Sequence, residues 1–361
     1  MKALKLFTLA FFTHLLLMVY ANTFLNEKLY ATELPFHQIL IAVFISLAFF
    51  GVLVFGYLKP IKLPKSVYWF ILFILSFALP GYGQFAVLIM FFLSREYNIF
   101  EKYAKFVLLG SILSVIFLYA VEGIPLFNWE LRFKLVKPLV LFAFLGGISL
   151  TYCTLNWKLK TLVFILFEIL FFAGTFRSLM LLAFLFYFLP YYYDEKLSFE
   201  KILIGLPVFL FVIYLSGNLE SLLTRMGFTF LVFHNIVSVS LPFGFFHGKL
   251  LLHSDPRWRI AFMFTLNGRY TYSLFGQPIA DFGVFGALEA YLLGTLLKFS
   301  EKNKATASVV LATLIYALES GIDAFLLSVL LLFGGVYSTD LLPPPKGQGF
   351  QEKKVTPKQD L

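Results

Sequence analysis

The sequence has few charged residues, few histidines and a single cysteine. Only 14% of its 361 residues are charged, whereas 60% are hydrophobic and 48 are phenylalanine. A water-soluble domain of this size could not bury so much apolar surface, so the composition indicates a polytopic membrane protein. Cys153 alone cannot form a disulfide within the chain, and no spacing of histidines, cysteines and carboxylates is typical of a metal site. We therefore expect neither a metal nor another cofactor.

Apolar stretches recur along the chain, and a helix needs about 20 largely apolar residues to cross the hydrocarbon core. The sequence PGYG at residues 80–83 interrupts one region, which we interpret as a re-entrant hairpin; a single kinked span is the alternative. We predict an all-α polytopic membrane protein with about 11–12 transmembrane helices. The candidate spans are residues 4–25, 36–58, 66–79, 84–93, 106–121, 138–155, 161–175, 178–193, 202–217, 278–297, 305–319 and 322–338.

Two segments do not have the character of spans. Residues 218–277 are rich in aromatic and apolar side chains, and we expect one large outer loop that packs on the helix bundle. Residues 339–361 contain three consecutive prolines and a pair of lysines, which is typical of a disordered tail, here a cytoplasmic one. The remainder, residues 1–338, is predicted to form a single transmembrane domain. The sequence has no recognisable internal repeat.

Lysine and arginine are distributed differently along this predicted topology. With residues 66–93 taken as a hairpin, 18 of the 22 lysines fall on the side of both termini, and six of the seven arginines fall on the other side. Short loops rich in lysine mark the cytoplasmic side, so both termini are predicted to be cytoplasmic. The net charge of +9 therefore reflects topology. Because the lysines are spread over many loops, nucleic-acid binding is not expected.

The arginines on the outer side indicate an anion held at that face. A guanidinium group offers five donors in a planar fork that suits phosphate oxygens, whereas lysine is a compact point charge. Arginine on the translocated side also runs against the usual charge distribution of membrane proteins. A lipid-linked pyrophosphate is the obvious outer-face ligand. The candidate binding residues are Arg132, Arg177, Arg225 and Arg269. Arg257 and Arg259 are as well explained by surface pairing.

Carboxylates are predicted near the outer helix ends, close to these arginines. Asp281, Glu319 and Asp323 fall at the predicted level of the arginines, where each would either orient an arginine or act as a general base. Histidine also suits proton transfer near neutral pH, and His234 in the long loop is the strongest candidate of the five histidines.

Three short motifs occur in a characteristic order. They are residues 122–127 (EGIPLF), residues 174–180 (GTFRSLM), and a glycine-spaced stretch from Ser273 to Gly294 after the long loop. In these motifs and in its single large loop the chain resembles the O-antigen polymerase (Wzy-type) or oligosaccharide repeat unit polymerase family. Two departures are that Glu122 replaces a glycine and that one extra residue precedes Arg177. The related O-antigen ligases carry a histidine before the glycine-spaced helix, where this chain has Tyr272, so the polymerase branch is favoured.

The resemblance implies a GT-C-like helical fold and metal-independent glycosyl transfer at the outer face of the cytoplasmic (inner) membrane. The substrates would be polyprenyl-pyrophosphate-linked oligosaccharides, and membrane lipids, a flippase and a chain-length regulator would be partners. In this scheme the outer arginines stabilise the departing diphosphate, and the base is Asp281, His234 or Glu122. The alternatives are an O-antigen ligase and a flippase or exporter of the same lipid-linked sugars.

Overall fold

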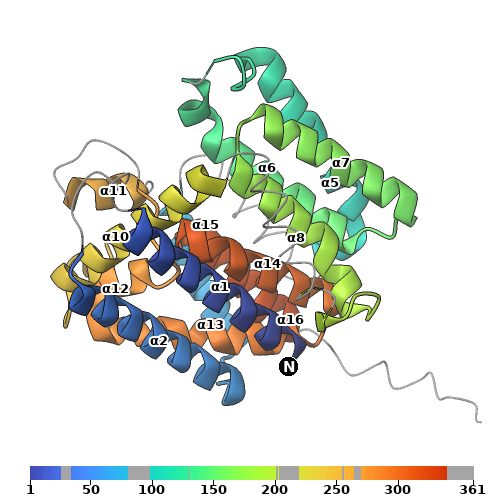
Figure 1. Cartoon of the computed structure of the whole chain (residues 1–361). Helices are drawn as coiled ribbons and strands as arrows, with labels where there is room; N and C mark the ends of the chain where they lie inside the picture. Colours follow the sequence, from blue (N-terminus) through green and yellow to red (C-terminus); the bar gives the residue numbers. More distant parts are fainter. Residues whose placement is uncertain are drawn as a thin grey trace, which may run out of the picture.

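Every regular element in the described part of the chain is helical. The computed structural model describes residues 1–25, 34–79, 98–128, 130–200, 202, 219–253, 256–263 and 270–339 (Figure 1). The helices are α1 (Lys2–Phe24), α2 (Phe36–Leu58), α3 (Lys65–Ser76), α5 (Ile99–Glu122), α6 (Leu131–Tyr152), α7 (Trp157–Ala173), α8 (Arg177–Tyr193), α10 (Leu219–Ser240), α11 (Pro256–Met263), α12 (Gly276–Phe282), α13 (Ala287–Ser300), α14 (Lys304–Ser320), α15 (Ala324–Leu330) and α16 (Tyr337–Thr339). A 3₁₀ turn, η2 (Gly283–Gly286), joins α12 to α13, and a π-helical turn, η3 (Leu331–Val336), joins α15 to α16.

Six segments are long and apolar enough to cross a membrane. They are α1, α2, α5, α6, residues Leu222–Ser240 of α10, and Gly276–Ser300, which runs from α12 to α13. Helices α7, α8 and α14 have 17 residues each, at the short end of the range for a crossing helix. The prediction of an all-α polytopic membrane protein is confirmed. The expected span 84–93, almost all of span 202–217 and the tail from residue 340 lie outside the described residues.

Two helices begin seven residues earlier than the apolar spans predicted from the sequence. The spans 106–121 and 138–155 correspond to α5, which starts at Ile99, and α6, which starts at Leu131. An apolar-run criterion ends where charged residues begin, but a helix can continue past the hydrocarbon core. As a result Arg132 belongs to the first turn of α6, which gives its side chain a defined direction.

The segment 218–277, which we expected to be a loop, contains the long helix α10. This helix packs against α1 and α12 and buries Phe230 and Phe233 on its inner face. Its apolar residues therefore pack on the bundle, as predicted, but in helical form. The chain then returns along α12, where the backbone N–H groups of Leu250 and Leu251 donate hydrogen bonds to the carboxylate of Asp281 at 2.9 and 2.8 Å.

The glycine-spaced stretch allows two helices to approach closely. Helices α2 and α13 pack along each other, and a Cβ atom on Gly294 would overlap the carbonyl oxygen of Leu53. Gly56 of α2 meets the backbone of Tyr291 in the same way. Small residues at a helix crossing permit such contact between backbones, which membrane helices use in place of a hydrophobic driving force.

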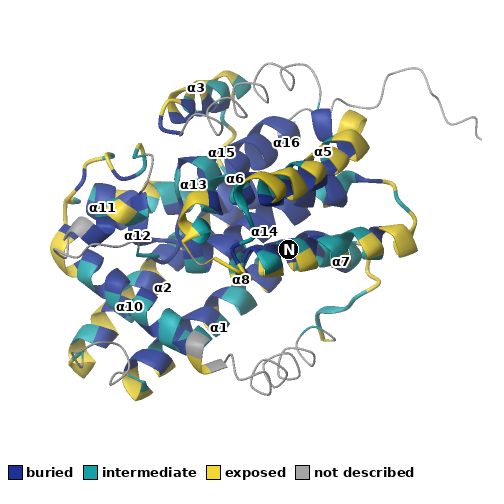
Figure 2. Cartoon of the chain, turned by 90° about the horizontal axis from the view of Figure 1, so that it is seen from above, coloured by how far each residue is buried: buried dark blue, intermediate teal, exposed yellow. Residues whose placement is uncertain are grey.

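Helix α14 lies at the centre of the bundle, and α5 and α7 lie at its edge. Most residues of α14 are buried, whereas α5 and α7 present large exposed apolar side chains such as Phe106, Phe117 and Ile169 (Figure 2). A contiguous exposed apolar surface of this kind suits contact with lipid.

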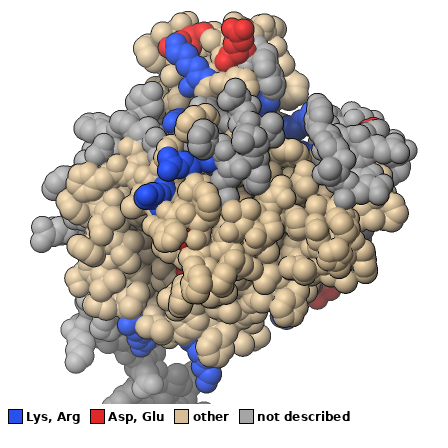
Figure 3. Space-filling model, turned by 90° about the vertical axis from the view of Figure 1, so that its left-hand side faces the viewer, with Lys and Arg blue, Asp and Glu red and all other residues tan. Residues whose placement is uncertain are grey.

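Charged residues gather at two opposite ends of the helices. Helix α8 runs from Arg177 to the turn at Asp194, and α14 runs from Lys304 to Ser320, with Glu319 in its last turn. On the face shown in Figure 3, the lysine and arginine side chains lie toward the upper and lower parts, and few charged side chains appear in between. We call the end with Lys2, Lys298, Lys302 and Lys304 the lysine end, and the end with Arg132, Arg177, Arg225 and Arg257 the arginine end.

Candidate functional site

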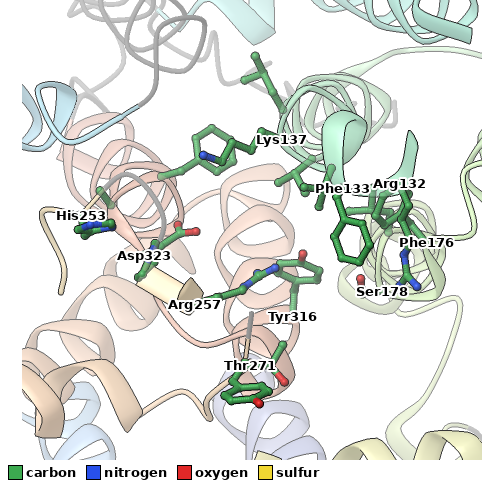
Figure 4. Close-up of a pocket in the computed structure, with 18 of the residues that line it drawn as sticks. Arg132, Phe133, Lys137, Phe176, Ser178, His253, Arg257, Thr271, Tyr316 and Asp323 are labelled. Atoms are coloured by element: carbon green, nitrogen blue, oxygen red, sulfur yellow. The ribbon is translucent and has the colours of Figure 1, made fainter. Parts of the chain in front are cut away.

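A cavity of about 420 Å³ lies at the arginine end, between α6, α8, α10, α11, α14 and α15 (Figure 4). Among the described residues its lining includes one carboxylate, that of Asp323, and four basic side chains: Arg132, Lys137, Arg225 and Arg257. Its size is typical of a small-molecule site. Because the lining carries more positive than negative charge, the cavity favours an anionic ligand.

One wall of the cavity is built around Arg132. The Cζ atom of its guanidinium group lies 5.3 Å from the ring centroid of Phe176, a cation–π arrangement that holds the side chain in place. The charges of Arg225 and Arg177 both act on Arg132. Arg225 and Arg177 each repel Arg132, and a polyanion bound beside these groups would offset that repulsion.

The sequence motif at residues 122–127 helps to hold this wall together. Gly123 ends α5 with a φ of 96°, a conformation that favours glycine, and the backbone N–H of Leu126 donates to the carbonyl of Ala173 at 2.9 Å. The Tyr119 hydroxyl donates to the carbonyl of Leu170 at 2.8 Å. Residues 122–127 therefore lie against the end of α7, and the starts of α6 and α8 are brought side by side.

Arg225 enters the cavity from the second turn of α10. Its Nε lies 2.7 Å from Oε1 of Glu319, the penultimate residue of α14, whose side chain is only 17% exposed. The other carboxylate oxygen lies 3.9 Å from Nε2 of the buried His14 in α1. The expectation that Glu319 pairs with an arginine is confirmed, and this ion pair fixes the direction of the Arg225 side chain.

Arg257 lies between the two sides of the cavity. Figure 4 shows it pointing toward Tyr316, with Asp323 and His253 on one side and Arg132 and Phe176 on the other. Burial lowers the pKa of Arg257, but Tyr316 and Asp323 raise it, and the net shift is upward. Arg257 therefore remains a permanent cation in the cavity.

A chain of hydrogen bonds positions Arg257 and Asp323. The buried Tyr272 donates from its hydroxyl to the carbonyl of Ile322 at 2.8 Å, beside Asp323. Two residues earlier, the backbone N–H of Tyr270 donates to the carbonyl of Arg257 at 3.2 Å. Asp323 caps α15 by accepting from the backbone N–H of Leu326 at 2.9 Å. The start of α11 and the turn between α14 and α15 are thus tied to each other through residues 270–272.

Comparison with known proteins identifies the family. The family described as "Putative O-antigen polymerase" matches residues 8–333. The chain belongs to the O-antigen polymerase family. A protein of Methanocaldococcus jannaschii, itself uncharacterized, is 28% identical over 329 residues, which cover 81% of this chain and 84% of that protein. No solved structure matches. The family resemblance seen in the sequence is therefore confirmed.

In this O-antigen polymerase family member, the predicted anion-binding arginines lie in part around one cavity. Arg132 and Arg225 line it. Arg177, the first residue of α8, is exposed and does not belong to the lining, although its charge acts on Arg132 and the next residue, Ser178, lines the cavity. Arg269 lies outside the described residues.

The three predicted bases lie elsewhere in the structure. Glu122 ends α5 and forms an ion pair with Lys134. His234 is buried in α10, with its Nδ1 3.2 Å from Oδ1 of Asn235. Asp281 is fully buried, and it also accepts a hydrogen bond from Gln277 at 2.9 Å. None of the three lines the cavity in the described part of the chain, and their role as base stays a prediction.

Sequence reasoning overlooked Lys137 and Tyr316 and gave Arg257 no preference, although all three line the cavity. A signal for Lys137 was present, because the lining residues of α6 recur with helical spacing at positions 132, 133, 136, 137, 140 and 141. That pattern is visible only once α6 is known to start at Leu131. Tyr316 carries no charge and sits in an apolar span, so no sequence signal marked it.

Proposed function

We propose that the protein polymerises polyprenyl-pyrophosphate-linked oligosaccharide units by metal-independent glycosyl transfer at the outer face of the cytoplasmic membrane. The observation that carries this proposal is the cavity at the arginine end, where Arg132, Arg225 and Arg257 line one space of about 420 Å³. Three guanidinium groups on one cavity match the several oxygens of a diphosphate.

The reaction needs a leaving group that can carry negative charge. A hydroxyl of the acceptor sugar attacks the anomeric carbon of the growing chain, and a new C–O bond forms. The bond from the anomeric carbon to the diphosphate breaks, and its electron pair stays on the diphosphate oxygen. Fixed guanidinium groups stabilise that charge in the transition state, where such preorganised donors have their largest effect.

The remaining lining suits the other parts of an amphipathic substrate. Val136, Val140 and Leu141 of α6 form an apolar wall opposite α15, next to the cationic residues. The ring of Tyr270 and the hydroxyl of Thr271 offer stacking and hydrogen bonding to a sugar. A lipid diphosphate that carries an oligosaccharide combines these three chemistries.

The test is reconstitution with a defined substrate. Purified protein in lipid nanodiscs is incubated with one polyprenyl-pyrophosphate-linked repeat unit, and the products are separated by size. A ladder of lengthening oligosaccharides supports the polymerase. Products that form only when a lipid A-core acceptor is added would indicate a ligase, and movement of intact substrate across vesicles without diphosphate release would indicate a flippase or exporter.

Metal independence is tested in the same assay. We expect a chelator of divalent cations to leave the rate of ladder formation unchanged, because the proposed charge stabilisation comes from arginine side chains. A rate that falls with the chelator and returns with added Mg²⁺ or Mn²⁺ would show that a metal takes part.

A further inference from the structure

Asp323 occupies a distinct place in the cavity. It is the only carboxylate among the described lining residues, and it lies beside Arg257. The bases predicted from the sequence, Asp281, His234 and Glu122, do not line this space. A general base has to come within hydrogen-bond reach of the proton that it removes, so a carboxylate in the cavity is better placed than one buried elsewhere.

We propose that Asp323 is the general base that accepts the proton of the acceptor hydroxyl. The inference rests on the proposed function, because it requires a hydroxyl nucleophile in the cavity. As the acceptor oxygen forms its bond to the anomeric carbon, its proton passes to a carboxylate oxygen of Asp323. The electron pair of the broken anomeric bond leaves with the diphosphate, so charge and atoms balance.

The surroundings of Asp323 fit this role. The backbone N–H of Leu326 holds Oδ1 at 2.9 Å, which limits rotation of the carboxylate. Arg257 lies beside the carboxylate in the cavity, as Figure 4 shows. Because Arg257 lines the same cavity as Arg132 and Arg225, the carboxylate and the diphosphate-binding groups face one shared space.

His253 is the competing base in the cavity. It lines the same space, and its ring lies 6.3 Å from the ring of Trp258, nearly parallel to it. Stacking on Trp258 holds the imidazole in place, as a base requires. The same arrangement is also typical of a ring that only packs against its neighbour or a substrate. The roles of Asp323 and His253 can be distinguished experimentally, because Asp323→Asn and His253→Gln each remove the proton acceptor but retain a polar side chain of similar size.

The experiment measures the release of polyprenyl diphosphate by purified protein in nanodiscs, with the defined repeat unit as substrate. Asp323→Asn removes the charge but preserves the helix cap, since asparagine caps helices as well as aspartate does. We expect diphosphate release at saturating substrate to slow by about 100-fold or more, the usual contribution of a general base. Binding of free polyprenyl diphosphate, measured separately, should stay within about threefold of wild type.

Controls assign the outcome. Asp194→Asn makes the same change at the lysine end and should release diphosphate at the wild-type rate. Release by Asp323→Asn within about threefold of wild type would overturn the proposal, as would a loss explained by weaker diphosphate binding. A large loss in His253→Gln with Asp323→Asn still active would move the base to His253.

Measuring diphosphate release also shows whether the role of Asp323 or the proposed polymerase function has failed. If wild-type protein releases diphosphate but forms no ladder, the polymerase proposal fails while Asp323 can still be judged from its own variant, whichever hydroxyl accepts the sugar. If wild-type protein releases no diphosphate with any acceptor, no glycosyl transfer takes place and both proposals are overturned.

Discussion

The two charged ends of the molecule are built differently. At the lysine end, cations meet carboxylates in ion pairs: the terminal ammonium of Met1 and Lys298 with Glu301, Lys2 with Glu195, and Lys304 with Asp194. At the arginine end, Arg225 pairs with Glu319 and Lys134 with Glu122, but four basic side chains, Arg132, Lys137, Arg225 and Arg257, also line a cavity with a single carboxylate in its described lining. Paired charges at an exposed end serve structure and topology, whereas an excess of positive over negative charge around a cavity favours an anionic ligand.

The basic side chains of the cavity are mostly arginines, with Lys137 as the exception, whereas those named at the other end are lysines. Lysine suits an exposed end, because its compact charge is strongly hydrated. Arginine suits a cavity, because its fork can make two parallel hydrogen bonds to phosphate oxygens. If this difference is functional, replacing arginine by lysine at the arginine end should lower activity, whereas replacing lysine by arginine at the lysine end should not.

Among the tests of this comparison, the largest effect is expected for Arg257→Lys. The charge stays but the fork is lost, so we expect kcat/KM for ladder formation to fall by about 100-fold, similar to the loss of one transition-state donor. The matched control is Lys304→Arg at the lysine end, which should leave kcat/KM unchanged. Equal rates for Arg257→Lys and wild type would remove the distinction between the two ends.

A smaller effect is expected for Glu319→Gln. Arg225 would keep its position in α10 but lose the charge of the carboxylate that lies 2.7 Å from its Nε. We expect the Kd for polyprenyl diphosphate to rise about tenfold, as for the loss of one charge-assisted contact. Glu301→Gln at the lysine end is the control and should not change this Kd. An unchanged Kd in Glu319→Gln would show that the pair does not orient Arg225 for binding.

The helix crossing between the two ends can be tested through its glycines. Gly294→Ala places a methyl group where the Leu53 carbonyl lies, so we expect the protein to lose about 1–3 kcal/mol of stability, the usual cost of overpacking. Gly51→Ala, also in a helix but with open space around its Cβ position, should be neutral or slightly stabilising. Thermal unfolding in detergent compares the two variants. The same stability for both would argue against close backbone packing of α2 and α13.

The smallest effect is expected for Lys304→Met at the lysine end. Its partner Asp194 is partly exposed and Lys304 is 69% exposed, so the lost ion pair should cost at most about 1 kcal/mol of stability, the range measured for surface pairs. Ladder formation should continue at the wild-type rate. A strong loss of activity would mean that the lysine end takes part in function and would break the comparison.

Sequence reasoning predicted the helices better than it predicted the site. Most expected spans correspond to observed helices, because an apolar run in a membrane protein has few alternatives to a helix. Arg132 and Arg225 were identified from charge sorting alone. Asp281 and Asp323 looked equivalent in sequence, since each follows or begins an apolar span. Their environments differ because of residues far away in the sequence. The backbone N–H groups of Leu250 and Leu251 donate to the carboxylate of Asp281, whereas Arg257 lies beside Asp323.

The sequence by itself determined the membrane class and the approximate helix positions. These properties depend on the composition of continuous segments, because the cost of placing a charge in lipid and the gain from an apolar run are local quantities. Only the tertiary structure decided which cations share a cavity and which carboxylate joins them. Arg132, Arg225, Arg257 and Asp323 come from four separate parts of the chain, and contacts such as Arg225 with Glu319 and Tyr272 with Ile322 bring them together.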